Sequence, residues 1–96
     1  MPEFPGGMDE LARFLSANLK YPASVYHNEL EGKVFVSFVV ERDGAVTHAT
    51  VEKGMGSDYD EEALRVIGLM PKWKPGKQNG KAVSVKFTLP VIFVIR

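Results

Sequence analysis

The chain contains no cysteine among its 96 residues, so neither a disulfide framework nor thiolate chemistry can account for its stability or its function. It also has no apolar run near the roughly 18 residues that cross a bilayer, and no signal peptide. We therefore expect any export signal or membrane anchor to lie outside this sequence. An excess of one charge is absent as well, with 12 basic and 12 acidic residues. This neutral balance argues against nucleic acid as the main partner.

Groups that carry catalysis are scarce too. The two histidines, His27 and His48, belong to no serine–histidine–carboxylate cluster and to no metal-ligand spacing. An acidic run within residues 58–62 lies where a helix is expected to begin, and the helix dipole explains it better than a bound cation does. We therefore expect no enzyme activity, no metal or cofactor, and no small-molecule substrate.

What is present is the composition of one small folded domain, with 45% hydrophobic and 25% charged residues. Residues 1–7 carry two prolines and two glycines, which oppose a helix. They are predicted to form an extended segment whose Phe4 tucks against the domain. Residues 8–96 are predicted to form the domain itself.

Residues 33–41 organise the rest of the chain. Between Lys33 and Glu41 at its ends, both faces of this stretch are apolar apart from Ser37, which is typical of a strand in the middle of a sheet. The Asp43-Gly44 pair is a strong hairpin signal, and it predicts that residues 45–53 return as an antiparallel neighbour.

The second strand is less regular than the first. Its apolar residues change phase between Val46 and Val51, and one extra residue near Thr47 and His48 would restore the pattern. We therefore expect a β-bulge there, with the His48 side chain in solvent.

Two main helices and a short one are predicted from apolar residues at helical spacing and from helix-start signals. Residues 8–19 form the first helix, and residues 22–28 a short helix that opens on a proline. Ser57 or Asp58 caps the third, which runs to about Met70.

Residues 71–80 hold two prolines and two glycines, and we expect an irregular, stiff segment. Trp73, the single tryptophan, is predicted to pack into the seam between sheet and helices. Lysines gather in and beside this segment, and either exposure to solvent or contact with an anion would suit them: Lys72, Lys74, Lys77 and Lys81.

Residues 81–95 are predicted to form the last strand, because their apolar residues alternate along its length. Pro90 has no backbone donor, which confines this strand to an edge of the sheet. The intervening helix returns the chain so that the last strand runs antiparallel to the central one. The predicted fold is therefore α+β, with a three-stranded antiparallel sheet in the order 2-1-3 and two main helices packed on one face.

An ordered set of motifs resembles the C-terminal domain of TonB over roughly residues 4–95. The opening Phe-Pro-Gly-Gly and the strand that contains Pro90 resemble the Bacteroidetes-type branch of that family. The motifs are Tyr21-Pro22, the run from Glu31 to Val40, Asp43-Gly44-Ala45-Val46, Glu62-Ala63-Leu64 and Trp73-Lys74-Pro75-Gly76-Lys77.

The resemblance implies a periplasmic domain whose full-length protein is anchored in the inner membrane by an N-terminal helix. Such proteins couple the ExbB–ExbD proton-motive-force motor to outer-membrane transporters for siderophores, vitamin B12 or glycans. The domain grips a short transporter segment, the TonB box, which adds as a strand beside the last strand. It also implies contacts just after the Tyr-Pro pair, although the Arg and Gln of well-known members are absent here. The residues expected to bind are Ala82, Val83, Ser84, Val85, Lys86, Phe87, Thr88, Tyr21, Pro22, Ser24, Val25 and Tyr26.

Two other uses of the same edge stay open. A TonB-like domain on a membrane sensor or peptidase-like protein would bind another periplasmic peptide. Alternatively, the last strand would pair with a second copy of the chain and form a homodimer. The segments that precede the domain would distinguish a sensor or peptidase-like protein from a TonB protein. Sedimentation over a range of concentrations would distinguish a monomer from a homodimer.

Overall fold

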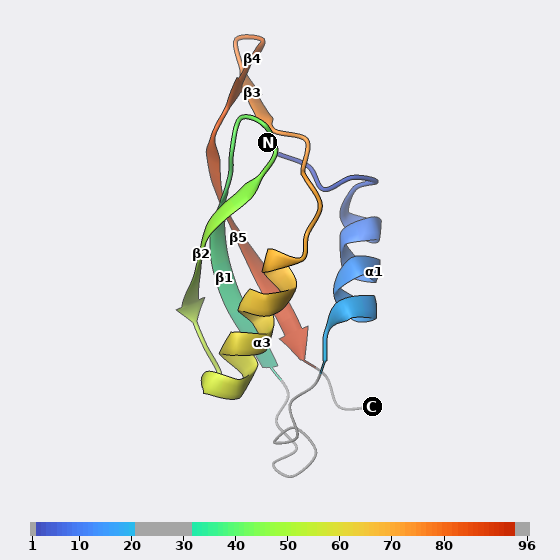
Figure 1. Ribbon diagram of the computed structural model, residues 1–96, viewed down its shortest axis with the longest axis vertical. Coiled ribbons are helices and arrows are strands. Elements are labelled where there is room, and N and C mark those ends of the chain that lie inside the picture. Colours follow the sequence, from blue (N-terminus) through green and yellow to red (C-terminus); the bar gives the residue numbers. More distant parts are fainter. Residues whose placement is uncertain (1, 21–31, 94–96) are drawn as a thin grey trace.

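The computed structural model describes residues 2–20 and 32–93 (Figure 1). The short helix predicted for residues 22–28 lies outside the described residues and stays a prediction. In chain order the described elements are helix α1 (Met8–Asn18), strands β1 (Gly32–Val40) and β2 (Val46–Lys53), helix α3 (Ser57–Gly68), and strands β3 (Gly76–Gln78), β4 (Lys81–Val83) and β5 (Val85–Phe93).

Strand β1 is the middle strand of a three-stranded antiparallel sheet in the order β2-β1-β5. The predicted α+β class and the order 2-1-3 are confirmed. Strands β1 and β5 pair without interruption, from Gly32 opposite Phe93 to Val40 opposite Val85. A strand that is apolar on both faces is typical of the middle of a sheet, and a neighbour on each side pairs its backbone N–H and C=O groups.

The pairing of β1 with β2 contains two register shifts. One of them lies between the pairs Ser37–Thr50 and Val39–Thr47, and it includes His48 with a φ of 54°. A residue inserted in one strand lets the apolar positions on either side face the same core. The predicted bulge is confirmed, and the His48 side chain is 75% exposed as expected.

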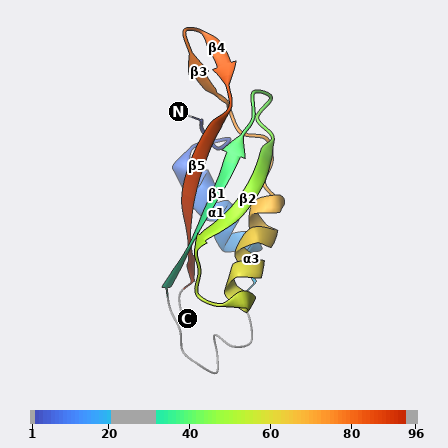
Figure 2. The same ribbon diagram turned by 90° about the vertical axis from the view of Figure 1, so that its left-hand side faces the viewer.

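Both helices cover the same face of the sheet (Figures 1 and 2). Alternate residues of β1, from Val34 to Val40, are fully buried and share one core cluster with Leu11 of α1 and Ile67 of α3. Burying each such side chain contributes about 1.5–3 kcal/mol. This apolar contact holds the two helices on the sheet.

An aromatic cluster closes the core at the end near the β1–β2 turn. Trp73 is 4% exposed, and its ring centroid lies 5.6 Å from Phe4, 5.4 Å from Phe38 and 5.5 Å from Phe87. The predicted seam position of Trp73 is confirmed, and Phe4 does tuck against the domain. The backbone of Glu3 also exchanges two hydrogen bonds, of 2.9 and 2.7 Å, with that of Lys74.

The region after Trp73 differs from the sequence prediction. Residues 76–78 are not irregular; they form β3, which pairs with β4 in a separate two-stranded hairpin. The turn is made by Asn79 and Gly80, with φ values of 52° and 78°, and consecutive residues with positive φ give the tight turns that hairpins prefer. The predicted strand over residues 81–95 is therefore divided at Ser84 into β4 and β5.

The helix ends also depart slightly from prediction. Helix α3 has Gly56 at its N-cap, and no side chain caps it, so the predicted cap by Ser57 or Asp58 was wrong. The carboxylate of Asp60 instead accepts a 3.0 Å hydrogen bond from the backbone N–H of Met55. Beyond Gly68 the chain makes tighter i to i+3 hydrogen bonds, which end the helix two residues before Met70.

Candidate peptide-binding edge

Strand β5 is an edge of the sheet, since one side pairs with β1 and no other described strand lies beside it. The opposite edge, β2, is broken by register shifts and carries His48 in a left-handed conformation. Irregularities of this kind blunt an edge against added strands. The described sheet therefore has one regular edge, and it is β5, as the position of Pro90 predicted.

Pro90 indicates which peptide groups of β5 point outward. It lies opposite Phe35 and has no N–H to donate to β1, so its peptide nitrogen belongs on the open side. Peptide groups alternate between the two sides of an antiparallel strand. The N–H groups of Lys86 and Thr88 therefore also face the open side, where they can donate hydrogen bonds to an added strand.

The side chains of β5 hold this edge in place. Lys86 and Thr88 are exposed, whereas Val85 and Phe87 are half-buried on the helix side. The Phe87 ring packs 5.8 Å from that of Phe38. One face of the strand is thus anchored in the core, and a peptide that added to β5 would meet an already formed strand.

The other predicted binding residues fall into two groups. Ala82 and Val83 belong to β4, opposite Lys77 and Gly76 of β3, and Ser84 lies between β4 and β5. The predicted run of seven residues is therefore two strands with a break between them. Five further residues lie outside the described part of the chain, so their contribution stays a prediction: Tyr21, Pro22, Ser24, Val25 and Tyr26.

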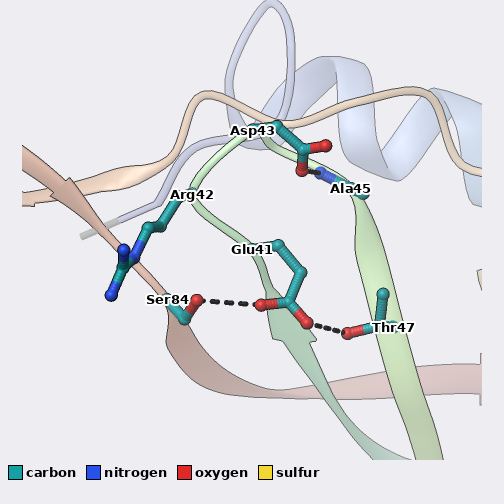
Figure 3. Close-up of a pocket in the computed structure, with 6 residues that line it drawn as sticks. All are labelled: Glu41, Arg42, Asp43, Ala45, Thr47 and Ser84. Atoms are coloured by element: carbon teal, nitrogen blue, oxygen red, sulfur yellow. Dashed lines mark hydrogen bonds between the residues drawn. The ribbon is translucent and has the colours of Figure 1, made fainter.

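Glu41 joins three parts of the structure beside the break in the strand. Its carboxylate accepts a 2.6 Å hydrogen bond from Thr47 of β2 and a 2.8 Å hydrogen bond from Ser84 (Figure 3). These two hydroxyl groups, Thr47 first, lower the pKa of Glu41. The recess that these residues line with Arg42 and Asp43 is shallow and open. Glu41 therefore ties the start of β5 to the hairpin between β1 and β2.

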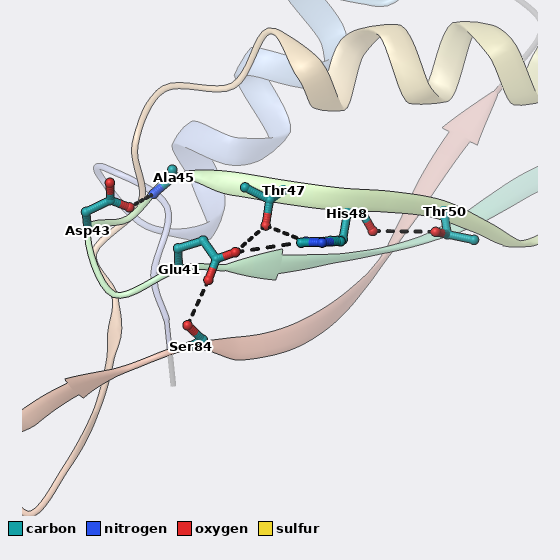
Figure 4. Close-up of polar contacts among 7 residues, drawn as sticks. All are labelled: Glu41, Asp43, Ala45, Thr47, His48, Thr50 and Ser84. Carbon is teal, nitrogen blue, oxygen red and sulfur yellow. Dashed lines mark hydrogen bonds and ion pairs between the residues drawn. The ribbon is translucent and has the colours of Figure 1, made fainter.

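His48 lies at the margin of this network. Its Nδ1 is 2.9 Å from the Thr47 hydroxyl and 3.9 Å from a carboxylate oxygen of Glu41 (Figure 4). Both contacts are exposed. The contact between His48 and Glu41 is an ion pair only when the imidazole is protonated. An exposed ion pair of this kind contributes little to stability.

A second polar contact lies on the face of the sheet that the two helices do not cover. Glu52 of β2 accepts a 2.6 Å hydrogen bond from the Ser37 hydroxyl and lies 3.5 Å from the ammonium of Lys86 on β5. The Ser37 hydroxyl, followed by Lys86, lowers the pKa of Glu52. Ser37 is only 2% exposed, and its small side chain leaves room above β1 for the pair. This contact holds the Lys86 side chain over the uncovered face of the sheet.

The two helices are joined by a clamp at the end of α1. Arg65 donates a 2.7 Å hydrogen bond to the Asn18 carbonyl, and Glu62 accepts one from the backbone N–H of Lys20. Hydrogen bonds from Arg65 lower the pKa of Glu62. The clamp holds the last described residues before the Tyr-Pro motif against α3.

These contacts were not predicted from the sequence, although one signal was present. Asn79-Gly80 is as strong a hairpin dipeptide as the one at residues 43–44, and it could have identified β3 and β4. Glu41 and Glu52 carry no comparable signal, because their hydroxyl partners lie on other strands. Their roles depend on strand order and register.

Acid is expected to destabilise the domain through Glu41, Glu52 and Glu62. The folded state lowers all three pKa values, so between about pH 5 and pH 3 the unfolded state binds more protons than the folded state. Their stabilisation is fully present above the unfolded pKa of about 4.3 and is lost as the pH falls through the lower folded values. Urea unfolding at several pH values measures how the free energy of unfolding changes with pH.

The control for this prediction is the triple variant Glu41→Gln, Glu52→Gln, Glu62→Gln. Its free energy of unfolding should depend less on pH over the same range, because glutamine does not titrate. Equal slopes for the variant and the natural sequence would show that these contacts do not stabilise the fold.

The fold and its open edge define a class, namely small α+β domains in which two helices cover one face of a three-stranded antiparallel sheet. The chain matches the family described as Gram-negative bacterial TonB protein C-terminal over residues 17–95. It belongs to this family, as the motifs indicated.

Solved structures agree with this assignment. A solution structure of the Helicobacter pylori TonB C-terminal domain is 26% identical, with a TM-score of 0.66, and the match covers 96% of this chain and 87% of that one. A shorter fragment from the same source is 25% identical, with a TM-score of 0.58 and 88% of each chain covered. No curated protein matches the chain.

Membership in the family gives the domain its general role. TonB C-terminal domains are periplasmic, non-catalytic domains of energy transducers, and they interact with outer-membrane transporters. Among the described residues, neither helix has the length and hydrophobicity of a membrane span. The same residues contain no cluster of three or more potential metal-binding side chains.

Proposed function

We propose that this domain binds the TonB box of an outer-membrane transporter as an added strand beside β5. The observation that carries the proposal is the regular, unpaired edge of β5, whose nine residues pair with β1 on the other side only. Strand addition uses main-chain hydrogen bonds, so it demands little of the partner's sequence. That suits a domain that serves more than one transporter.

The expected affinity is modest. Each main-chain hydrogen bond contributes about 1 kcal/mol net, and the cost of ordering the peptide offsets part of the sum. Pro90 interrupts the row of outward donors, so docking centres on Lys86 and Thr88, with Ala82 to Ser84 as a further segment beyond the break. A complex of this kind forms and dissociates readily.

We further propose that the complex transmits force. Tension along an added strand loads its hydrogen bonds together, so a weakly bound peptide resists pulling for a short time. In this scheme an N-terminal helix anchors the full-length protein in the inner membrane, and the ExbB–ExbD motor supplies the pull. Rupture of the peptide complex at the force of a single hydrogen bond would contradict the scheme.

A titration with TonB-box peptides tests the docking edge. Amide resonances of residues 82–88 and of the segment 21–26 should shift, while those of β2 stay unchanged. The variant Thr88→Pro should weaken binding at least about fivefold, because it removes one outward donor worth about 1 kcal/mol and places a ring against the incoming strand.

The matched control is Thr88→Val, which keeps the N–H and the shape of the side chain and should bind as the natural sequence does. Thermal melts of both variants check that the domain stays folded. Undiminished binding by a folded Thr88→Pro variant would place the peptide elsewhere. A spectrum that millimolar peptide leaves unchanged would favour the sensor-type or self-pairing uses of the edge.

A further inference from the structure

The charges of the chain are balanced in total but segregated along the sequence. All 12 acidic residues lie within residues 1–62, whereas seven of the 12 basic residues follow them. Strands β3, β4 and β5 lie in this later part of the chain and carry no acidic residue. Three of the basic residues lie on them: Lys77 and Lys81 on the hairpin, and Lys86 on the candidate docking strand that continues from it.

The hairpin of β3 and β4, residues 76–83, forms a basic arm. It projects beyond the β1–β2 turn at one end of the molecule and lies apart from both helices (Figures 1 and 2). Lys77 and Lys81 are exposed on it, and no ion pair joins either of them to another described residue. By contrast, Lys72 pairs with Asp43 at the base. The positive charges of the two lysines near the tip are therefore not paired with any acidic side chain of the described residues.

The register of the arm decides what kind of partner these lysines can meet together. Lys77 lies opposite Ala82, and Gln78 lies opposite Lys81. Neighbouring positions of a strand point to opposite faces, so Lys77 and Lys81 lie on opposite faces of a narrow ribbon. A peptide along one face would meet one lysine, whereas a charged surface that meets the tip end-on would meet both.

The chemistry of the tip points the same way. Gln78, Asn79 and Gly80 are exposed and polar, and none offers the large apolar side chain that inserts among acyl chains. Lysine is a compact, hydrated charge on a flexible stem, without the fork that arginine uses for bidentate recognition. Such a tip is better suited to contact with many lipid headgroups than to recognition of a single binding site with a defined geometry.

From this arrangement we propose that the basic arm docks its tip on an anionic phospholipid surface. The arm leads through Ser84 into β5, and the hydrogen bond from Ser84 to Glu41 connects the arm to the sheet. Docking would hold the β5 edge near the membrane in which a transporter is embedded; for that consequence alone the inference rests on the proposed function. Each lysine near such a surface raises binding roughly fivefold, so the contact is weak, reversible and sensitive to salt.

Vesicle sedimentation at low ionic strength tests the inference. The domain should sediment with vesicles of equal parts phosphatidylglycerol and phosphatidylcholine, but not with pure phosphatidylcholine. The variant Lys77→Gln/Lys81→Gln should partition roughly tenfold to thirtyfold less onto the anionic vesicles. The control Lys33→Gln/Lys53→Gln removes the same charge from exposed positions at the other end of the sheet, and it should bind as the natural sequence does.

Several results would overturn the inference. These are no binding to anionic vesicles, an equal loss in the control variant, and displacement by inorganic phosphate at an ionic strength at which sodium chloride leaves the domain bound. Stronger binding of the arm to a soluble poly-glutamate peptide than to the vesicles would assign it an acidic protein partner. The peptide titration of the arm variant keeps the two proposals separate, because TonB-box shifts should persist there even if vesicle binding fails.

Discussion

Replacing Phe38 with alanine is expected to lower the free energy of unfolding by about 3–5 kcal/mol. Phe38 is fully buried in the middle strand. Its ring lies 5.4 Å from Trp73 and 5.8 Å from Phe87. The substitution removes both contacts and leaves a cavity between sheet and helices. Domains of this size are stable by only about 5–15 kcal/mol, so the melting temperature should fall by more than about 10 °C.

The neighbouring residue provides the control for that substitution. Val39 lies on the other face of β1 and is half-buried, so Val39→Ala should cost about 1 kcal/mol or less. Urea unfolding monitored by the fluorescence of Trp73 measures both variants. Equal losses at the two positions would mean that the helix-covered face is not the main core.

Replacing Gly44 with alanine is expected to cost at least about 2 kcal/mol. The residue has a φ of 89°, and a Cβ there would lie 2.2 Å from the carbonyl oxygen of Trp73. That oxygen belongs to the backbone, and the N–H of Trp73 donates a 2.9 Å hydrogen bond to the Gly44 carbonyl. The alanine therefore strains its own backbone and pushes apart the turn and the segment that carries Trp73.

Gly80 separates these two effects. Its φ is 78°, but a Cβ there would meet nothing within 4 Å, so Gly80→Ala should show the cost of the conformation alone, about 1–2 kcal/mol. Unfolding curves for both variants give the difference. If Gly80→Ala were as destabilising as Gly44→Ala, the close approach to Trp73 would not matter.

The two proposals assign different tasks to one continuous part of the chain. Residues 85–93 offer backbone groups to a peptide, and residues 76–83 offer charge to a surface. The hydrogen bond between Glu41 and Ser84 lies where the two parts meet. A change there is expected to alter the direction of the arm while leaving the pairing of β5 with β1 intact.

The sequence by itself determined the sheet, its order and the position of its open edge. Apolar residues on both faces of 33–41 indicated a central strand, the Asp43-Gly44 pair a hairpin, and Pro90 an edge. Even the bulge at His48 followed from a change of phase. These features depend on residues close together in the chain, so local pattern was enough to predict them.

Only the tertiary structure decided which polar groups meet and where the last strand is divided. Glu41 and Ser84 are far apart in sequence, and they meet because strand order and register bring their side chains to one point. Whether the basic residues would scatter or gather likewise depended on the hairpin at residues 76–83 standing free of the core. Contacts between distant residues follow from the packing of the whole chain, and no local pattern specifies them.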